Sequence, residues 1–166
     1  KSPLTIKATF LGAHAYPAAF KQNHEGYLKL LINEMLPVIA AEGLADFIDI
    51  FCEHGYFSVE DTEQILTAGA RYGLSPKVHV NQFNIIGGVA ASVKHNALSV
   101  DHLELIDDSD LAALKNSETM PVALPGCSLF LKITFFSISK SFIFLIVSLK
   151  ISFKSLIILF FSSIII

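Results

Sequence analysis

The sequence predicts an α/β fold built on a parallel β-sheet, and three observations lead to this prediction. Short segments rich in β-branched and aromatic residues alternate with segments whose apolar residues recur every three or four positions. Each strand-like segment is followed by a helix-length segment, which is the pattern of βα units. The hydrophobic fraction of 52% over 166 residues is too high for a disordered chain.

Five strands are expected, each ending near a glycine, proline or polar turn residue. They cover residues 5–11, 45–52, 77–80, 98–100 and 120–124. Gly12 is expected to end the first strand, and Pro125-Gly126 to end the last.

Four helices are expected between these strands. They cover residues 26–42, 58–73, 85–97 and 107–116. Pro37 is expected to break or restart the first helix, because proline lacks the backbone donor that a helix interior needs. Ser58 and Asp61 have the spacing of a capping box, and Gly73 is expected to close the helix that they open.

Five such strands fit two architectures, a doubly wound sheet or part of a (β/α)₈ barrel. A complete barrel needs about 250 residues, and at least about 200. The 166-residue chain is too short for a complete barrel, so it predicts either the open sheet or an incomplete barrel.

The last 35 residues, 132–166, form a compositionally separate tail of Ile, Phe, Leu, Val, Ser, Thr and Lys. A membrane helix needs about 20 consecutive apolar residues, but the longest lysine-free stretch here is residues 155–166. The tail lacks turn residues and a sustained period, so we expect it not to be native to the fold of residues 1–131. A hydrophobic anchor and a genuine element of the fold are the alternatives.

Composition excludes several functions. The net charge of −3 excludes a broad nucleic-acid surface, and a signal peptide is not expected, because residues 1–10 have no long apolar core. Two distant cysteines do not form a disulfide framework, so a cytoplasmic protein with reduced thiols is expected. Cys52 is expected to be a small buried hydrophobic residue, and Cys127 follows a Pro-Gly turn without a predicted partner.

Polar side chains occur at or just beyond the ends of four consecutive predicted strands. These residues are His14, Glu53, His79 with Gln82, and Asp101 with His102 and Glu104. The carboxyl ends of parallel strands share one edge of a sheet, where α/β proteins carry their sites. Imidazoles with carboxylates favour a transition-metal hydrolase over a nucleotide site. The alternative for a lone histidine such as His79 is a hydrogen-bonded core residue.

Five stretches resemble the imidazolonepropionase family of metal-dependent amidohydrolases. In order, they are TFLGAHAYP, DFIDIFCEHGYFSVEDTEQIL, GLSPKVHVNQF, LSVDHLE and ALPGCSLFL, within about residues 4–131. The resemblance implies a partial (β/α)₈ TIM barrel of the amidohydrolase type over residues 1–131, supplying about strands three to seven.

The resemblance implies hydrolysis of 4-imidazolone-5-propanoate, a small-molecule substrate, to N-formimidoyl-L-glutamate in histidine degradation, with one zinc or iron ion. His79 matches a metal ligand, His14 and Gln82 match substrate-binding positions, and His102 matches a residue of the catalytic centre. Glu53 matches a site-facing acid without a firm role. A homodimer is compatible with the family, and neither nucleic acid nor a membrane is an expected partner.

The sequence also departs from the family pattern. The family's His-x-His metal pair would precede Lys1, and its late aspartate ligand would stand where the tail begins. One imidazole cannot hold zinc tightly, because stable sites use three or four ligands. The chain is therefore expected to retain metal poorly and to be an inactive piece of a hydrolase; a non-catalytic remnant or binding module is the alternative.

Overall fold

The computed structural model describes residues 3–132, which form one five-stranded parallel sheet in the order β1-β2-β3-β4-β5. The strands are β1 (Thr9–Ala13), β2 (Phe47–Cys52), β3 (Ser75–Val80), β4 (Ser99–His102) and β5 (Met120–Ala123). Every strand pairs in parallel with the strand that follows it in the chain. The α/β prediction with a parallel sheet is confirmed.

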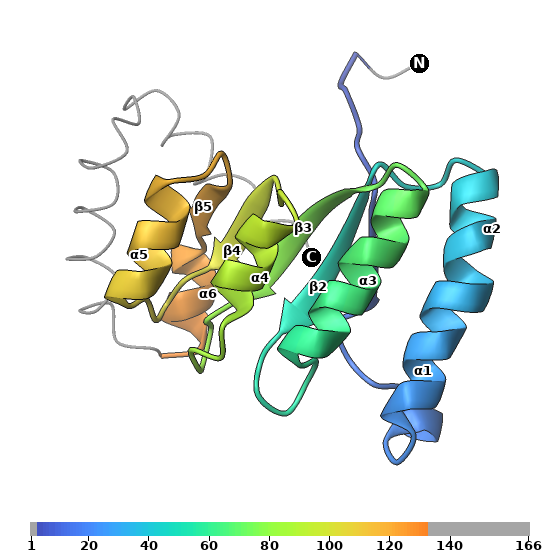
Figure 1. Ribbon diagram of the computed structural model, residues 1–166, viewed down its shortest axis with the longest axis horizontal. Coiled ribbons are helices and arrows are strands. Elements are labelled where there is room, and N and C mark those ends of the chain that lie inside the picture. Colours follow the sequence, from blue (N-terminus) through green and yellow to red (C-terminus); the bar gives the residue numbers. More distant parts are fainter. Residues whose placement is uncertain (1–2, 133–166) are drawn as a thin grey trace.

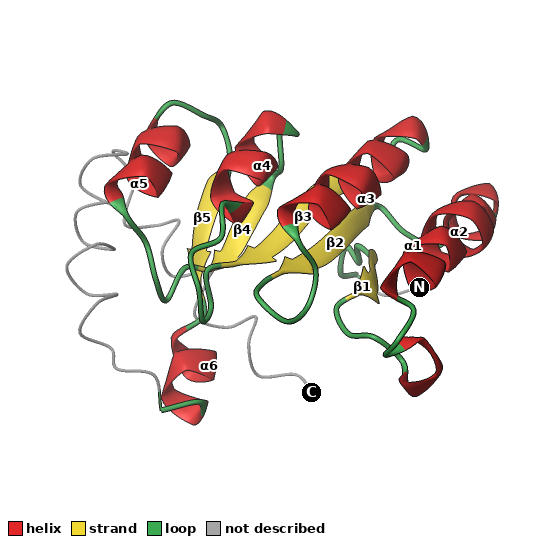
Figure 2. Ribbon diagram, turned by 60° about the horizontal axis from the view of Figure 1, so that its bottom comes forward, coloured by secondary structure: helices red, strands yellow, loops and turns green. Residues whose placement is uncertain are grey.

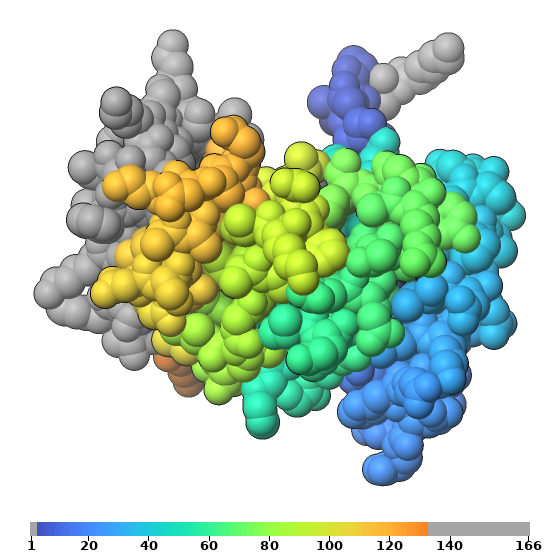
Figure 3. Space-filling view, viewed as in Figure 1, coloured from blue at the N-terminus to red at the C-terminus, as the bar shows by residue number. Residues whose placement is uncertain are grey.

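Helices cover one face of this sheet. The helical segments are a 3-10 turn (Ala18–Phe20), α1 (His24–Leu30), a π-helical turn (Leu31–Met35), α2 (Leu36–Ala41), α3 (Val59–Arg71), α4 (Gly88–Lys94), α5 (Asp108–Lys115) and α6 (Pro125–Phe130). Helices α1 to α5 lie on one side, whereas α6 lies on the other (Figure 1, Figure 2). The space-filling view shows side chains from α1 to α5 across the helical face (Figure 3).

Alternation along the strands divides the sheet into an apolar face and a polar face. Ile48 lies against Gly69 of α3, and Cys52 and Val80 lie against Gly88 of α4. These three side chains are 0–1% exposed and belong to the main hydrophobic core. Successive strand residues point to opposite faces, so Asp49 is directed away from the helices.

Local signals fixed some helix ends as predicted. The capping box is present, because Ser58 Oγ accepts from Asp61 N and the Asp61 side chain accepts from Ser58 N. Gly73 has φ +74°, a conformation that glycine adopts freely, and it follows the end of α3. The Asp107 side chain caps α5 by accepting from Asp110 N.

Pro37 stands where the first helix restarts as α2, which is one of the two outcomes that the sequence predicted. The helical turns run from α1 through the π-helical turn into α2. Pro37 occupies the first turn of α2, directly after the wider turn. Proline is tolerated there because a first-turn residue does not need to donate an intrahelical hydrogen bond.

Three further boundaries differ from the prediction. Pairing with β2 begins at Thr9, so β1 starts four residues late and continues through Gly12 to Ala13. Helix α4 begins only at Gly88, because Gly87 is left-handed with φ +97°. Pro125-Gly126 ends β5 but also opens α6, a helix that the sequence analysis missed.

The predicted tail, residues 132–166, lies outside the described residues except for Lys132. Its predicted separation from the fold stays a prediction. Within residues 3–132 no helix is long and apolar enough to cross a membrane.

Candidate functional site

Three of the histidines singled out in the sequence converge at the carboxyl-terminal edge of the sheet. His14 directly follows β1, His79 lies near the end of β3, and His102 is the last residue of β4. The ring centroids of His14 and His79 are 4.6 Å apart, and those of His79 and His102 are 5.1 Å apart. The parallel order of the strands therefore brings together side chains that are far apart in the sequence.

Asp49 joins two of these histidines. Its Oδ1 lies 3.2 Å from His14 Nε2 and 3.0 Å from His79 Nδ1, and its side chain is only 2% exposed. An ionised carboxylate only accepts hydrogen bonds, so each imidazole donates to it from the named nitrogen. Because Asp49 bonds to Nδ1 of His79, the other ring nitrogen, Nε2, is not bonded to Asp49. We call His14, Asp49 and His79 the first cluster.

Burial and hydrogen bonding oppose each other in the first cluster. Burial disfavours the ionised carboxylate of Asp49, but the hydrogen bonds from His14 and His79 outweigh it and lower the pKa of Asp49. Burial likewise disfavours the charged form of His79, but the hydrogen bond and charge of Asp49 outweigh it and raise the pKa of His79. The geometry therefore favours charge on both partners.

His102 is held by an unusual backbone. His102 has φ +88° and Leu103 has φ +58°, which are left-handed conformations at two successive residues that are not glycine. Such conformations are costly and are frequent at functional sites. In the register of β3 and β4, His102 pairs with Val80, whose side chain faces the helices. Regular alternation along β4 would therefore point the His102 side chain toward the helices as well. Instead, its ring lies beside that of His79.

A second cluster surrounds His102 on the side of α6. It consists of His102, Glu104 and Cys127, whose potential ligand atoms all lie within 4.8 Å of one another. Nδ1 of His102 lies 3.4 Å from both carboxylate oxygens of Glu104. The first cluster meets the same 4.8 Å criterion. Each of these two groups could hold a metal ion.

Gln82 and Cys127 lie side by side, although Cys127 had no predicted partner. The Nε2 of Gln82 donates to Sγ of Cys127 over 3.5 Å. The unpredicted helix α6 carries Cys127 to this position. Burial, and then the charge of Glu104, raise the pKa of Cys127.

Glu53 holds the loop that follows β3. Its Oε1 accepts hydrogen bonds from His54 N and Asn84 Nδ2, each 2.9 Å long. Its Oε2 accepts from Phe83 N at 2.9 Å and from Asn84 N at 3.2 Å. The carboxylate is 1% exposed and fully engaged with backbone and amide donors. In this geometry Glu53 positions the segment next to Gln82.

Sequence reasoning missed Asp49 as a site residue. The missed signal is its place in the stretch FIDIF, where an acid interrupts an apolar strand. A charged side chain is rarely buried without partners, so an acid in such a strand indicates cationic or hydrogen-bonding neighbours on the same face.

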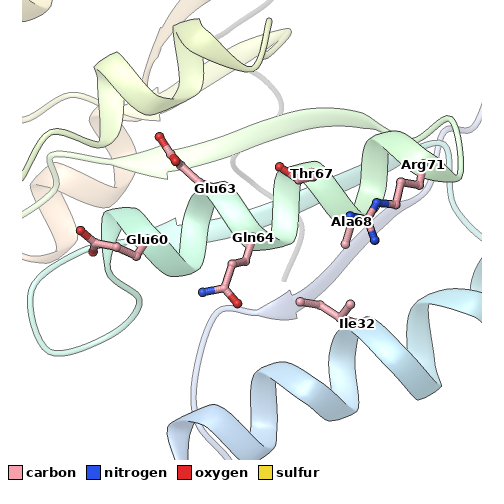
Figure 4. A pocket seen from close by; sticks show the side chains of 7 residues that line it. All are labelled: Ile32, Glu60, Glu63, Gln64, Thr67, Ala68 and Arg71. Carbon is pink, nitrogen blue, oxygen red and sulfur yellow. The ribbon is translucent and has the colours of Figure 1, made fainter.

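Two hollows in the surface of residues 3–132 are lined by residues outside both clusters. A groove of about 490 Å³ lies between the π-helical turn, which contributes Ile32, and α3, which contributes Gln64, Ala68 and Arg71 among others (Figure 4). Neither histidine nor cysteine lines this groove. Among the described residues, both groups of side chains that could hold a metal ion lie near the carboxyl ends of the strands.

Comparison with curated proteins gives close relatives. The imidazolonepropionase of Flavobacterium psychrophilum is 62% identical over 133 residues, which are 80% of this chain and 32% of the relative. The enzyme of Flavobacterium johnsoniae is 61% identical over 133 residues, with the same coverage. The chain is similar to imidazolonepropionase. The predicted resemblance is confirmed over this stretch, and the chain spans about a third of the length of these relatives.

Two other comparisons add little to the imidazolonepropionase match. No family model matches the chain. Among solved structures, the crystal structure of A. niger ochratoxinase aligns with a TM-score of 0.47 and 19% identity. The aligned region covers 72% of this chain and 30% of the ochratoxinase chain.

Proposed function

We propose that residues 1–131 form part of the (β/α)₈ barrel of an amidohydrolase that hydrolyses 4-imidazolone-5-propanoate to N-formimidoyl-L-glutamate. The observation that carries the proposal is the convergence of His14, His79 and His102 at one sheet edge. The sequential strand order with α1 to α5 on one face supports a barrel section, since doubly wound sheets carry helices on both faces. The similarity to imidazolonepropionases supports the reaction.

An imidazole oriented by a buried carboxylate, as His79 is by Asp49, fits a zinc or iron ion. Imidazole and carboxylate ligands suit these metals. His79 would offer Nε2, because Asp49 already holds Nδ1, and a carboxylate in this position fixes the ring and its tautomer. When bound, the ion would supply Lewis acidity and lower the pKa of water. The family's His-x-His pair has no counterpart in the sequence from Lys1 to Ile166.

The remaining side chains would act on the substrate. His102 would donate a hydrogen bond to the carbonyl oxygen as negative charge develops there. His14 and Gln82 would orient the ring and its propanoate arm. Gln82 can only hydrogen-bond, because an amide neither gives nor takes a proton at neutral pH. Glu53 would act indirectly, by holding the loop next to Gln82.

A segment exchange tests the proposal. The matching stretch of the Flavobacterium psychrophilum enzyme is replaced by this chain's residues 4–131, and loss of imidazolone absorbance is measured together with metal content. We expect the chimera to bind metal and turn over substrate. His79→Ala should abolish metal retention, and His102→Ala should abolish turnover while metal is retained.

His24→Ala is the matched control for these variants. His24 is exposed and stacks on Tyr16, away from both clusters, so this variant should retain turnover. A folded, metal-loaded chimera without turnover would contradict the proposal and favour a non-catalytic module. Full activity in the His79→Ala chimera would remove the ligand assignment.

A further inference from the structure

The second cluster brings together an imidazole, a carboxylate and a thiol, which are three types of metal-ligating group, and none of them belongs to the first cluster. His102 ends β4, Glu104 follows two residues later, and Cys127 lies on α6. Their potential ligand atoms lie within 4.8 Å of one another. We propose that His102, Glu104 and Cys127 form a second cation site, which binds a zinc-like divalent metal ion independently of the first cluster.

The buried Oε2 of Glu104, which has no hydrogen-bond partner among residues 3–132, supports cation binding at this position. Glu104 is 1% exposed, and its Oε2 has no hydrogen-bond partner among residues 3–132. His102 Nδ1 lies 3.4 Å from that oxygen, which is too long for a strong charge-assisted hydrogen bond. A buried anionic oxygen without a partner is costly. A metal ion bound between the three side chains would satisfy it.

Neighbouring side chains already orient two of the three donors. Ser128 Oγ donates to the other carboxylate oxygen, Oε1, over 2.8 Å, and this leaves Oε2 free. Gln82 Nε2 donates to Sγ of Cys127, a contact that also stabilises a thiolate. Such supporting hydrogen bonds are typical of metal ligands. Cys52, by contrast, is buried in the apolar core, away from the second cluster.

The donor set selects the class of metal. Magnesium and calcium prefer oxygen ligands, whereas a thiolate with an imidazole favours zinc. Tetrahedral zinc places its ligand atoms about 3.3–3.8 Å apart, so small side-chain rotations would bring the three donors into range. Three protein ligands leave the fourth position to water or to a small anion.

The site shares no ligand with the first cluster. It would, however, bind His102, which the proposed function assigns to the carbonyl oxygen of the substrate. The His102 ring lies next to that of His79, so the two clusters are neighbours. A cation held by His102 would withdraw this imidazole from the substrate, and zinc above one equivalent would inhibit turnover. This consequence rests on the proposed function, whereas metal binding does not.

Cadmium titration of the 166-residue chain tests the site without any activity assay. Cadmium bound by a thiolate gives a ligand-to-metal charge-transfer absorbance. We expect this absorbance to saturate at one equivalent. Cys127→Ser should abolish it, and the matched control Cys52→Ala should keep it. Absence of the absorbance in the unchanged chain, or its persistence in Cys127→Ser, would overturn the proposal.

Glu104→Gln distinguishes a three-donor site from a thiol that binds cadmium alone. Loss of an outer-shell partner costs metal sites about 10–100-fold in affinity, so loss of a direct ligand should weaken cadmium binding at least tenfold. His79→Ala should leave the affinity unchanged. Unaltered binding in Glu104→Gln would overturn the three-donor site.

Thiol alkylation gives a second measurement on the unchanged chain, in case a variant fails to fold. Cys127 is partly exposed and Cys52 is buried, so peptide mapping should find the label on Cys127. One equivalent of cadmium should slow this labelling at least tenfold. Equal labelling with and without cadmium would overturn the proposal. Neither result depends on imidazolone turnover, so the proposed function can fail separately.

Discussion

The two clusters at the sheet edge each pair an imidazole with a buried carboxylate, but the hydrogen-bonding capacity of the two carboxylates is satisfied to different degrees. In the first cluster, Asp49 accepts from two imidazoles at 3.0 and 3.2 Å. In the second cluster, Glu104 meets one imidazole at 3.4 Å and keeps an unpartnered oxygen among the described residues. A histidine–carboxylate pair can therefore be complete in itself or depend on a further ligand, and hydrogen-bond satisfaction separates the two cases.

The backbone explains this difference. Asp49 lies inside β2, and the register between β2 and β3 fixes its position along the strand relative to His79. Glu104 lies after two left-handed residues, and its partner Ser128 comes from α6. A carboxylate within a sheet is positioned by the ladder itself. A carboxylate in a loop needs contacts from another element.

The largest expected effect concerns catalysis by the first cluster alone. In the proposed function His79 is the one counterpart of the family's metal ligands, and the 166-residue sequence contains no His-x-His pair. We expect no imidazolone hydrolysis above the uncatalysed rate, because water without a metal keeps a pKa of about 15.7 instead of about 7. Absorbance of the imidazolone and elemental analysis of zinc check this in parallel.

The chimera with residues 4–131 is the positive control for that assay. Any zinc that remains on the 166-residue chain should depend on Cys127 and not on His79. Turnover by the chain with zinc lost in His79→Ala would contradict this prediction and would make the first cluster a sufficient site.

Asp49→Ala should give the largest loss of stability, since Asp49 links β1, β2 and β3. The variant removes two hydrogen bonds to a buried carboxylate, so we expect the free energy of unfolding to fall by about 3 kcal/mol. Urea unfolding followed by far-UV circular dichroism measures this change. Glu118→Ala, in an exposed turn, is the control and should change it by less than about 0.5 kcal/mol. Equal effects would show that Asp49 is not a structural link.

Much of this arrangement is predictable from the sequence, because strand-end position is a topological property. His14, His79 and His102 each follow or end an apolar segment, and parallel strands place those ends together. Asp49 was missed because its role depends on which side chains share its face, and a sequence does not give that register directly. One of its partners, His79, lies on β3, and the other, His14, directly follows β1.

Helix α6, which was not predicted, shows a second limit of the sequence analysis. Proline and glycine usually mark turns, and Pro125-Gly126 does end β5. However, proline also fits the first turn of a helix, as at Pro125 and Pro37. Local sequence does not distinguish these outcomes. Consequently, the contact between Gln82 and Cys127 became visible only in the structure.

The smallest expected effect comes from the matched amide change in the second cluster. Glu104→Gln keeps an oxygen to accept from Ser128 and replaces the unpartnered oxygen with an amide nitrogen. The variant removes a buried charge that lacks full compensation, so without metal the free energy of unfolding should change by less than about 1 kcal/mol in either direction. Asp49→Asn makes the same chemical change in the first cluster, where two imidazoles bond to the charged oxygen, and should cost about 2 kcal/mol. Urea unfolding in the presence of a chelator measures both variants. With cadmium added, unchanged protein should gain stability because the ion binds the folded state, whereas Glu104→Gln should gain much less. A loss above about 2 kcal/mol for Glu104→Gln in the chelator would show that Glu104 is satisfied without a cation, and the contrast between the two clusters would disappear.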